Sequence, residues 1–122
     1  MSDDPRHRLG RAGEQLAAEH LQRRGFRIVS RNHRTRFGEL DVIAYDGRVL
    51  VFAEVKTRRA GSGSPWDALD AAKCRQVRKM ASAWRAEPAD RPRSADLRFD
   101  AIGVVIDLRG RLVRLDHLEA AF

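Results

Sequence analysis

Two pairs of charged residues interrupt apolar stretches in the middle of the sequence. Glu39 and Asp41 stand at the start of one stretch, and Glu54 and Lys56 stand at the end of the next. Side chains alternate faces along a strand, so the members of each pair would project from one face. Carboxylates that meet across a sheet repel each other, and a hard cation such as Mg²⁺, held by carboxylates, water and substrate phosphate, would offset that repulsion. The alternative is a solvated charged face on a half-buried sheet.

A tight hairpin would bring the two pairs together. The dipeptide Asp46-Gly47 separates the apolar stretches and supplies the positive φ angles of a two-residue turn. That turn predicts three cross-strand pairs: Tyr45 with Arg48, Asp41 with Phe52, and Glu39 with Glu54. Asp41 and Glu54 would then lie diagonally on one face, roughly 7 Å apart. A different loop length would change these partners.

Length, charge and cysteine content limit the class of protein. The 122 residues suffice for a single domain, 1–122, in which we expect residues 1–5 to be disordered. The 24 Lys and Arg residues exceed the 17 Asp and Glu residues, and the formal charge of +7 favours a polyanionic partner such as nucleic acid. A basic protein without such a partner is the alternative. The single cysteine and the absence of an apolar signal or membrane span favour a cytoplasmic protein with no membrane partner.

The periodicity of apolar residues predicts two helices. The first runs from about Arg6 to Arg24, and Gly25 provides its stop. Glu14 lies on the flank of the apolar stripe of this helix, from which it could reach the charged face of the hairpin or pair with a nearby Arg. The second helix runs from Ser64 to Glu87. Its polar side is basic and includes Lys73.

Short apolar runs predict the remaining strands. They lie at 26–30, 97–106 and 112–115, and residues 118–122 form a tail that packs onto the body. The order of helix, strand, hairpin, helix and two strands predicts an α/β domain with a mixed β-sheet flanked by helices, in two or three layers.

Cations surround the predicted site along the sequence. Residues 31–38 are predicted to form a basic, flexible loop that leads into the hairpin, and its Arg31, Arg34 and Arg36 would contact phosphates or only aid solubility. Arg58 continues the charged face of the second hairpin strand. The basic side of the second helix could follow a phosphate backbone or could simply be solvated.

This set of residues resembles a known enzyme superfamily. Glu14 in a first helix, Gly38-Glu39-Leu40-Asp41 on one strand and Glu54-Val55-Lys56 on the next are similar to the motifs of the PD-(D/E)xK nucleases. More closely, the chain resembles the bacterial YraN family, which is regarded as similar to archaeal Holliday-junction resolvases. The likeness extends to Thr57-Arg58, Lys73, Arg98-Phe99-Asp100 and Ala121-Phe122. Leu40 stands where the name-giving motif of the superfamily has proline.

The resemblance implies a restriction-endonuclease-like sheet and a role for each site residue. Glu14, Asp41 and Glu54 would hold Mg²⁺ or Mn²⁺, with the backbone carbonyl of Val55 as a potential extra ligand. Lys56 would orient or help to deprotonate the attacking water. The residues that would hold the nucleic acid are Arg31, Arg34, Arg36, Arg58 and Lys73. Glu39 would bind a second metal ion or only shape the site, and a junction-cutting enzyme of this kind would often act as a homodimer.

Three functions remain open from the sequence. A metal-dependent endonuclease that hydrolyses phosphodiester bonds in DNA, branched DNA included, uses every feature above. A non-catalytic nucleic-acid-binding module would keep the fold and would bind without metal, with an affinity that falls as salt rises. A protein-interaction or RNA-associated role would leave the charged face vestigial, and Mg²⁺ or Mn²⁺ would then not change stability.

Overall fold

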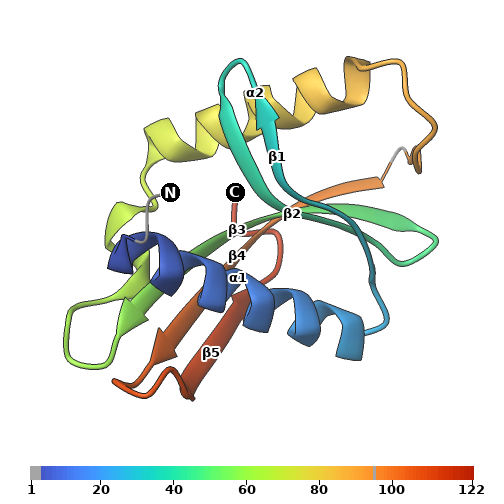
Figure 1. Ribbon diagram of the computed structural model, residues 1–122. Helices are drawn as coiled ribbons and strands as arrows, with labels where there is room; N and C mark the ends of the chain where they lie inside the picture. Colours follow the sequence, from blue (N-terminus) through green and yellow to red (C-terminus); the bar gives the residue numbers. More distant parts are fainter. Residues whose placement is uncertain (1–3, 95) are drawn as a thin grey trace.

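The computed structural model describes residues 4–94 and 96–122. Five strands form one mixed sheet in the order β1-β2-β3-β4-β5, with helix α1 packed against one face and helix α2 against the other (Figure 1). Strands β3 and β4 are parallel, and the other neighbouring strands are antiparallel. The predicted α/β fold, a mixed sheet flanked by helices, is confirmed. Within the described residues, no helix has the length and apolar character needed to cross a membrane.

The elements occur along the chain as α1 (Pro5–Arg23), β1 (Arg27–Thr35), β2 (Gly38–Tyr45), β3 (Val49–Arg59), the 3₁₀ helix η1 (Pro65–Ala68), α2 (Ala71–Ala86), β4 (Asp96–Ile106) and β5 (Leu112–Leu118).

Alternation of side chains along β3 divides the hydrophobic core into two clusters, one on each face of the sheet. Val51 and Ala53 pack in the cluster that includes α1, whereas Leu50 and Phe52 pack in the cluster that includes α2. Glu54 follows Phe52 by two residues, so it lies on the α2 face where the apolar run ends.

Helix α1 begins within a segment predicted to be disordered. Asp4 is the N-cap, since its Oδ1 accepts a hydrogen bond from the Arg6 N–H at 2.9 Å, and Pro5 occupies the first turn. The expectation of disorder is therefore wrong for these two residues, and residues 1–3 lie outside the described part of the chain. Further along, Gly13 allows α1 to approach β3, because any side chain there would collide with Thr57.

The loop between β2 and β3 is longer than predicted. Tyr45 pairs with Leu50 rather than with Arg48, so the predicted register is wrong by two residues. The loop is closed by the side chain of Asp46, whose Oδ1 accepts hydrogen bonds from the backbone N–H groups of Arg48 at 2.9 Å and Val49 at 2.8 Å. This Asp side chain, by accepting from the backbone two and three residues further on, closes a longer loop than the predicted two-residue turn.

Strand β1 occupies most of the segment predicted to be a flexible basic loop. It extends to Thr35, and only residues 36–37 connect it to β2. The strand predicted at 26–30 is its first part, and two features hid the remainder from pattern analysis. A bulge interrupts its pairing between Ile28 and Ser30, and Asn32 has a positive φ of 51°. Because most residues beyond the bulge are polar, the alternation between exposed and half-buried positions leaves no apolar signal.

The second predicted helix is divided at residues 69–70. Ser64 caps only the short helix η1, in a capping box with Asp67. Asp70 then caps α2, and its Oδ1 accepts a hydrogen bond from the Lys73 N–H at 2.9 Å. The prediction of one continuous helix is wrong because two N-cap residues lie six positions apart and both are used. The second cap places Lys73 in the first turn of α2.

The C-terminal predictions are confirmed. Strand β4 is internal, since it pairs with β3 on one side and β5 on the other. Strand β5 continues three residues beyond the predicted end at 115. The tail packs onto the body, because the Ala121 N–H donates to the Phe99 carbonyl at 2.7 Å and the ring of Phe122 lies 5.9 Å from the ring of Phe99.

Candidate active site

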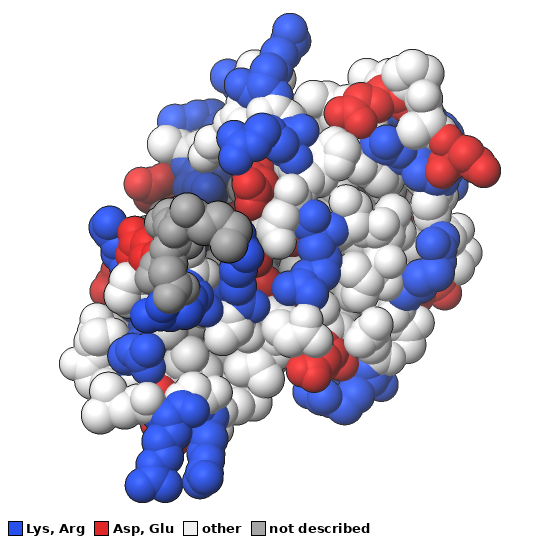
Figure 2. Space-filling model, in the orientation of Figure 1, with Lys and Arg blue, Asp and Glu red and all other residues white. Residues whose placement is uncertain are grey.

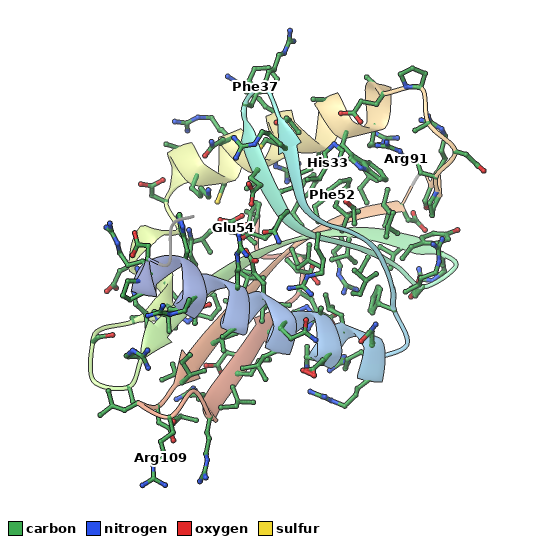
Figure 3. The ribbon with its side chains drawn as sticks, viewed as in Figure 1. His33, Phe37, Phe52, Glu54, Arg91 and Arg109 are labelled. Carbon is green, nitrogen blue, oxygen red and sulfur yellow. The ribbon has the colours of Figure 1, made fainter. Side chains whose placement is uncertain are left out.

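Glu54 lies at the centre of the predicted site and is only 3% exposed. Its Oε1 is 3.2 Å from the Nζ of Lys56, two residues along β3, and 3.2 Å from the Nζ of Lys73 on α2. Figure 3 shows Glu54 near the middle of the molecule. Two cations thus hold one buried carboxylate, and they come from different elements.

Asp41 is brought to this carboxylate by the register of the hairpin. Val42 pairs with Ala53, so Asp41 comes level with Glu54, and the predicted pairings of Asp41 with Phe52 and of Glu39 with Glu54 are wrong. The Oδ2 of Asp41 accepts a hydrogen bond from the Val55 N–H at 2.9 Å. Burial, together with the negative charges of Glu54 and Glu14, nevertheless raises the pKa of Asp41 to about 8.

Glu14 reaches the same cluster from α1. Burial raises the pKa of Glu14, opposed by a hydrogen bond with the Asn32 side chain and by the charge of Arg31. The carboxylates of Glu39 and Glu54 raise it further. Residues from α1, β2 and β3 therefore influence one another electrostatically, and Glu14 faces the strands.

The donor set fits a hard divalent cation. Three carboxylates gather where burial and their mutual repulsion favour protonation of Asp41, and a cation would neutralise the same negative charge. The three carboxylates are not yet spaced as the ligands of one metal ion, since the described residues contain no group of three or more acidic, His or Cys side chains positioned to hold a metal ion. Both lysines contact the same oxygen of Glu54, Oε1, so a cation bound by this carboxylate would lie close to two ammonium groups.

A pocket of about 360 Å³ opens beside Glu14. It lies between the first half of α1 and the hairpin of β1 and β2, and its polar lining residues are Arg6, His7, Arg11, Glu14, Asn32, Arg34 and Glu39. Two carboxylates therefore line a largely basic opening, which suits a ligand with phosphate groups. Figure 2 shows Lys and Arg side chains alongside acidic ones across this face of the molecule.

The predicted nucleic-acid-binding residues do not all lie at the carboxylate cluster. Lys73 lies within it, and Arg34 lines the pocket, where it is 3.4 Å from Glu39. Arg31 donates to the Gln15 side chain at 2.7 Å, and its buried Nε has no hydrogen-bond partner.

Two further predicted residues lie further away along the strands. Arg36 is at the tip of the β1–β2 hairpin, with its guanidinium over the Phe37 ring at 4.8 Å. Arg58 continues β3, as predicted, and donates to the Thr57 carbonyl at 3.0 Å. The metal-ligand role of the Val55 carbonyl stays a prediction, because the contact that Val55 makes with Asp41 uses its N–H.

The sequence reasoning missed the basic side chains that α1 presents to the pocket. His7 and Arg11 precede Glu14 by seven and three residues, so all three lie on one side of the helix. Helical spacing measured backwards from Glu14 would have identified them. The contact between Lys73 and Glu54 had no such local signal, because it depends on how α2 packs against the sheet.

A second buried carboxylate, Asp100 on β4, lies outside the predicted site and is fully inaccessible. It accepts four hydrogen bonds: from Arg98 Nε and Nη2 at 2.9 Å each, from His117 Nε2 at 2.7 Å and from the Ala120 N–H at 3.0 Å. Burial alone would raise the pKa of Asp100, but these hydrogen bonds outweigh it and hold the pKa below its ordinary value. His20 of α1 contacts His117 at 3.0 Å and completes this cluster.

Sequence comparison places the chain among bacterial relatives. Residues 13–104 match the family described as Uncharacterised protein family UPF0102. The UPF0102 proteins of Symbiobacterium thermophilum and Renibacterium salmoninarum are 49% and 46% identical to the chain, over 94% and 91% of its length and 96% and 92% of theirs. The UPF0102 protein of Pelotomaculum thermopropionicum is 42% identical over 98% of both chains. The matched residues include Glu14, Asp41, Glu54 and Lys56, and the chain belongs to the UPF0102 family.

Proposed function

We propose that this protein is a metal-dependent endonuclease of the PD-(D/E)xK type that hydrolyses phosphodiester bonds in DNA. The observation that carries the proposal is the gathering of Glu14, Asp41, Glu54, Lys56 and Lys73, from four separate elements, beside a basic pocket. Side chains that only stabilise a fold are not expected to be buried beside like charges until the pKa of one of them rises to about 8.

The carboxylates of Glu14, Asp41 and Glu54 would hold Mg²⁺ or Mn²⁺. When bound, such a cation supplies a water of lowered pKa and neutralises charge on the phosphate. Asp41 is oriented for this role by the Val55 N–H, which fixes one of its oxygens at 2.9 Å. Glu54 is oriented by the two lysines and is shielded from solvent.

Lys56 and Lys73 would supply positive charge to the reacting phosphate. The side chains of Lys56 and Lys73 are 21% and 26% exposed, so each could reach a ligand from its place beside Glu54. Preorganised cations in a site that is partly shielded from water stabilise the charge that develops during phosphoryl transfer. Lys56 would also orient the attacking water, and Arg34, together with Arg6 and Arg11 of the pocket, would hold neighbouring phosphates.

A non-catalytic nucleic-acid-binding module is the second candidate, and one observation favours it. The two lysines already neutralise Glu54, and the described carboxylates do not form a completed metal site. A protein that had lost turnover could keep this arrangement and its basic pocket. It would bind DNA in the absence of metal, with an affinity that falls as salt rises.

Cleavage assays on purified protein separate the two candidates. Labelled branched, flapped and single-stranded DNA is incubated with Mg²⁺ or Mn²⁺ and the wild type, Glu54→Gln or Lys56→Met. We expect each substitution to lower the cleavage rate by at least about 10²-fold. Glu19→Gln, on α1 with Glu14 but outside the gathered set, is the matched control and should cut like the wild type.

The outcomes are distinct. Equal cleavage by the wild type and both site variants would identify a contaminating nuclease and reject the proposal. Salt-sensitive DNA binding with no product from any substrate would select the binding module. Purification of all four proteins by one procedure makes the comparison of rates direct.

A further inference from the structure

The tip of the β1–β2 hairpin carries an aromatic side chain that is partly exposed. Phe37 lies between the two strands, is 36% exposed, and stands at the end of the hairpin in Figure 3. A single exposed apolar residue is ordinary on a protein surface. Phe37 differs from such residues in its neighbours and in the rigidity of its backbone.

Cations and small side chains surround the Phe37 ring. The Arg36 guanidinium lies 4.8 Å from the ring centroid, and the Lys79 ammonium of α2 lies 6.0 Å from it. The ring also lines an open pocket of about 540 Å³ whose floor includes Ala83 and Ala86 of α2. Among the described residues that line this pocket, none is acidic. Figure 2 shows Lys and Arg side chains gathered at the top of the molecule, over this tip.

The backbone that carries Phe37 is held firmly against α2. The Gln76 side chain donates to the Phe37 carbonyl at 2.7 Å, and the Phe37 N–H donates to the Thr35 hydroxyl at 3.1 Å. Gly38 follows with a φ of 130°, and a Cβ there would approach Gln76 Nε2 to 2.8 Å. The positive φ favours glycine at this position. The backbone at Phe37 is thus fixed before any ligand arrives, which reduces the entropy cost of binding.

An apolar ring face, an apolar floor and flanking cations match the chemistry of an unpaired nucleotide. Bases stack on exposed aromatic side chains in proteins that bind single strands, and nearby cations follow the phosphates. A base inside a duplex has both faces covered by its neighbours. We propose that an unpaired base stacks on Phe37 in place of the Arg36 guanidinium, which would move to an adjoining phosphate beside Lys79. This inference, in which Phe37 is a stacking platform, rests on the proposed function in assuming a DNA substrate.

The position of the platform relative to the carboxylates defines the substrate class. Phe37 precedes Asp41 by four residues along β2, which corresponds to about 13 Å of extended chain. Nucleotides along one strand of DNA are spaced by about 3.4 Å in a stacked helix, so roughly four of them span that distance. The structure thus favours DNA with an unpaired segment a few nucleotides from the bond that is cut, such as a flap, a fork or an open junction.

Binding to two matched strands tests the inference without any cleavage. A short labelled thymidine strand and the same strand with abasic sites in place of all bases are titrated by fluorescence anisotropy in EDTA. The proteins are the wild type, Phe37→Leu and Phe37→Trp, with Val113→Ala as control, since Val113 is an apolar residue 57% exposed on β5. Leucine keeps apolar bulk at the tip, whereas tryptophan keeps a ring face.

We expect Phe37→Leu to weaken binding of the thymidine strand by about 5- to 150-fold, the range for loss of one stacked base, and to leave abasic-strand binding unchanged. Phe37→Trp and Val113→Ala should bind both strands like the wild type. Equal weakening on both strands, or wild-type binding by Phe37→Leu, would overturn the inference.

The failure of this inference and that of the proposed function can be told apart. If the wild type cuts DNA and Phe37→Leu binds the thymidine strand normally, only the stacking platform is rejected. If Phe37→Leu weakens binding of the thymidine strand alone but no substrate is ever cut, the stacking role of Phe37 stands and the catalytic proposal is rejected. A wild type that binds neither strand would overturn both.

Discussion

Asp100 and Asp41 are both carboxylates held inside the protein, yet their partners are opposite in kind. Asp100 is surrounded by donors: Arg98, His117 and the Ala120 N–H supply four hydrogen bonds, and its pKa falls. Asp41 has one backbone donor, from Val55, and its pKa rises because of its burial and the charges of the Glu54 and Glu14 carboxylates. One cluster is electrostatically complete, and the other carries an excess of negative charge.

The difference separates a structural carboxylate from a candidate functional one. A buried acid that serves the fold needs its charge balanced by permanent partners, as Asp100 has. A buried acid that serves a ligand must leave charge for the ligand to balance, and the cluster of Glu14, Asp41 and Glu54 does so even with Lys56 and Lys73 in place. The comparison predicts that neutralising each Asp will change stability in opposite directions.

The largest expected effect is that of Asp100→Asn. The substitution keeps the shape of the side chain but removes the nearer charged partner of Arg98, whose side chain is 21% exposed, and leaves it Glu119 at 3.6 Å. Breaking a buried ion pair by removing one member typically costs about 3–5 kcal/mol of unfolding free energy. Urea unfolding followed by circular dichroism measures this loss. A loss below about 1 kcal/mol would contradict the view that Asp100 is a completed structural site.

Asp41→Asn should act in the opposite direction and stabilise the protein by about 1–3 kcal/mol at pH 8. The pKa of Asp41 rises from 3.8 to about 8 on folding, so the folded state binds more protons than the unfolded state between those pH values. Wild-type stability therefore falls as pH rises through that window, whereas asparagine does not titrate. The advantage of the variant should be small at pH 4, should grow up to pH 8 and should be constant above it.

Urea unfolding of both proteins from pH 4 to pH 9 measures this difference. Glu14 titrates in both, so its contribution largely cancels in the comparison. Destabilisation by Asp41→Asn at pH 8 would mean that Asp41 has a balancing partner, and the contrast with Asp100 would fail.

Most of the fold could be predicted because it follows from local periodicity. The apolar stripe of α1, the apolar runs of β3 and β4 and the turn signals between them were sufficient for a mixed α/β sheet. The first part of strand β1 was predicted at 26–30, but its continuation to Thr35 was missed because that half is polar and follows a bulge, so burial at the sheet edge left no apolar pattern. The division of the second helix was missed because Asp70 reads as an ordinary helical residue until it acts as a cap.

The site was predictable in its residue types and not in its geometry. The spacing of Asp41, Glu54 and Lys56 was sufficient to propose a shared face. The cross-strand pairing that brings Asp41 opposite Glu54 depends on the β2–β3 loop, which the Asp46 side chain closes and which is longer than predicted, so the register is shifted. The contact of Lys73 with Glu54 depends on the packing of α2. Such long-range contacts are set by tertiary structure and leave no mark in a local window of sequence.

Stabilisation of the folded protein by Mn²⁺ should be the smallest of these effects, and it tests directly whether the cluster around Asp41 binds a cation. A cation that binds only the folded protein at ten times its dissociation constant adds about 1.4 kcal/mol of stability, which for a domain of this size raises the melting temperature by about 4–8 °C. We expect this shift in the wild type and its absence in Asp41→Asn. Asp116→Asn, which removes a carboxylate on β5 that pairs with Arg114 at 2.7 Å, is the control and should keep the full shift.

Because the cation and the proton compete for Asp41, the Mn²⁺-induced shift in melting temperature should be larger at pH 8 than at pH 6. An equal shift in all three proteins would indicate binding to surface carboxylates, and the excess negative charge at Asp41 would then have no ligand among the hard cations.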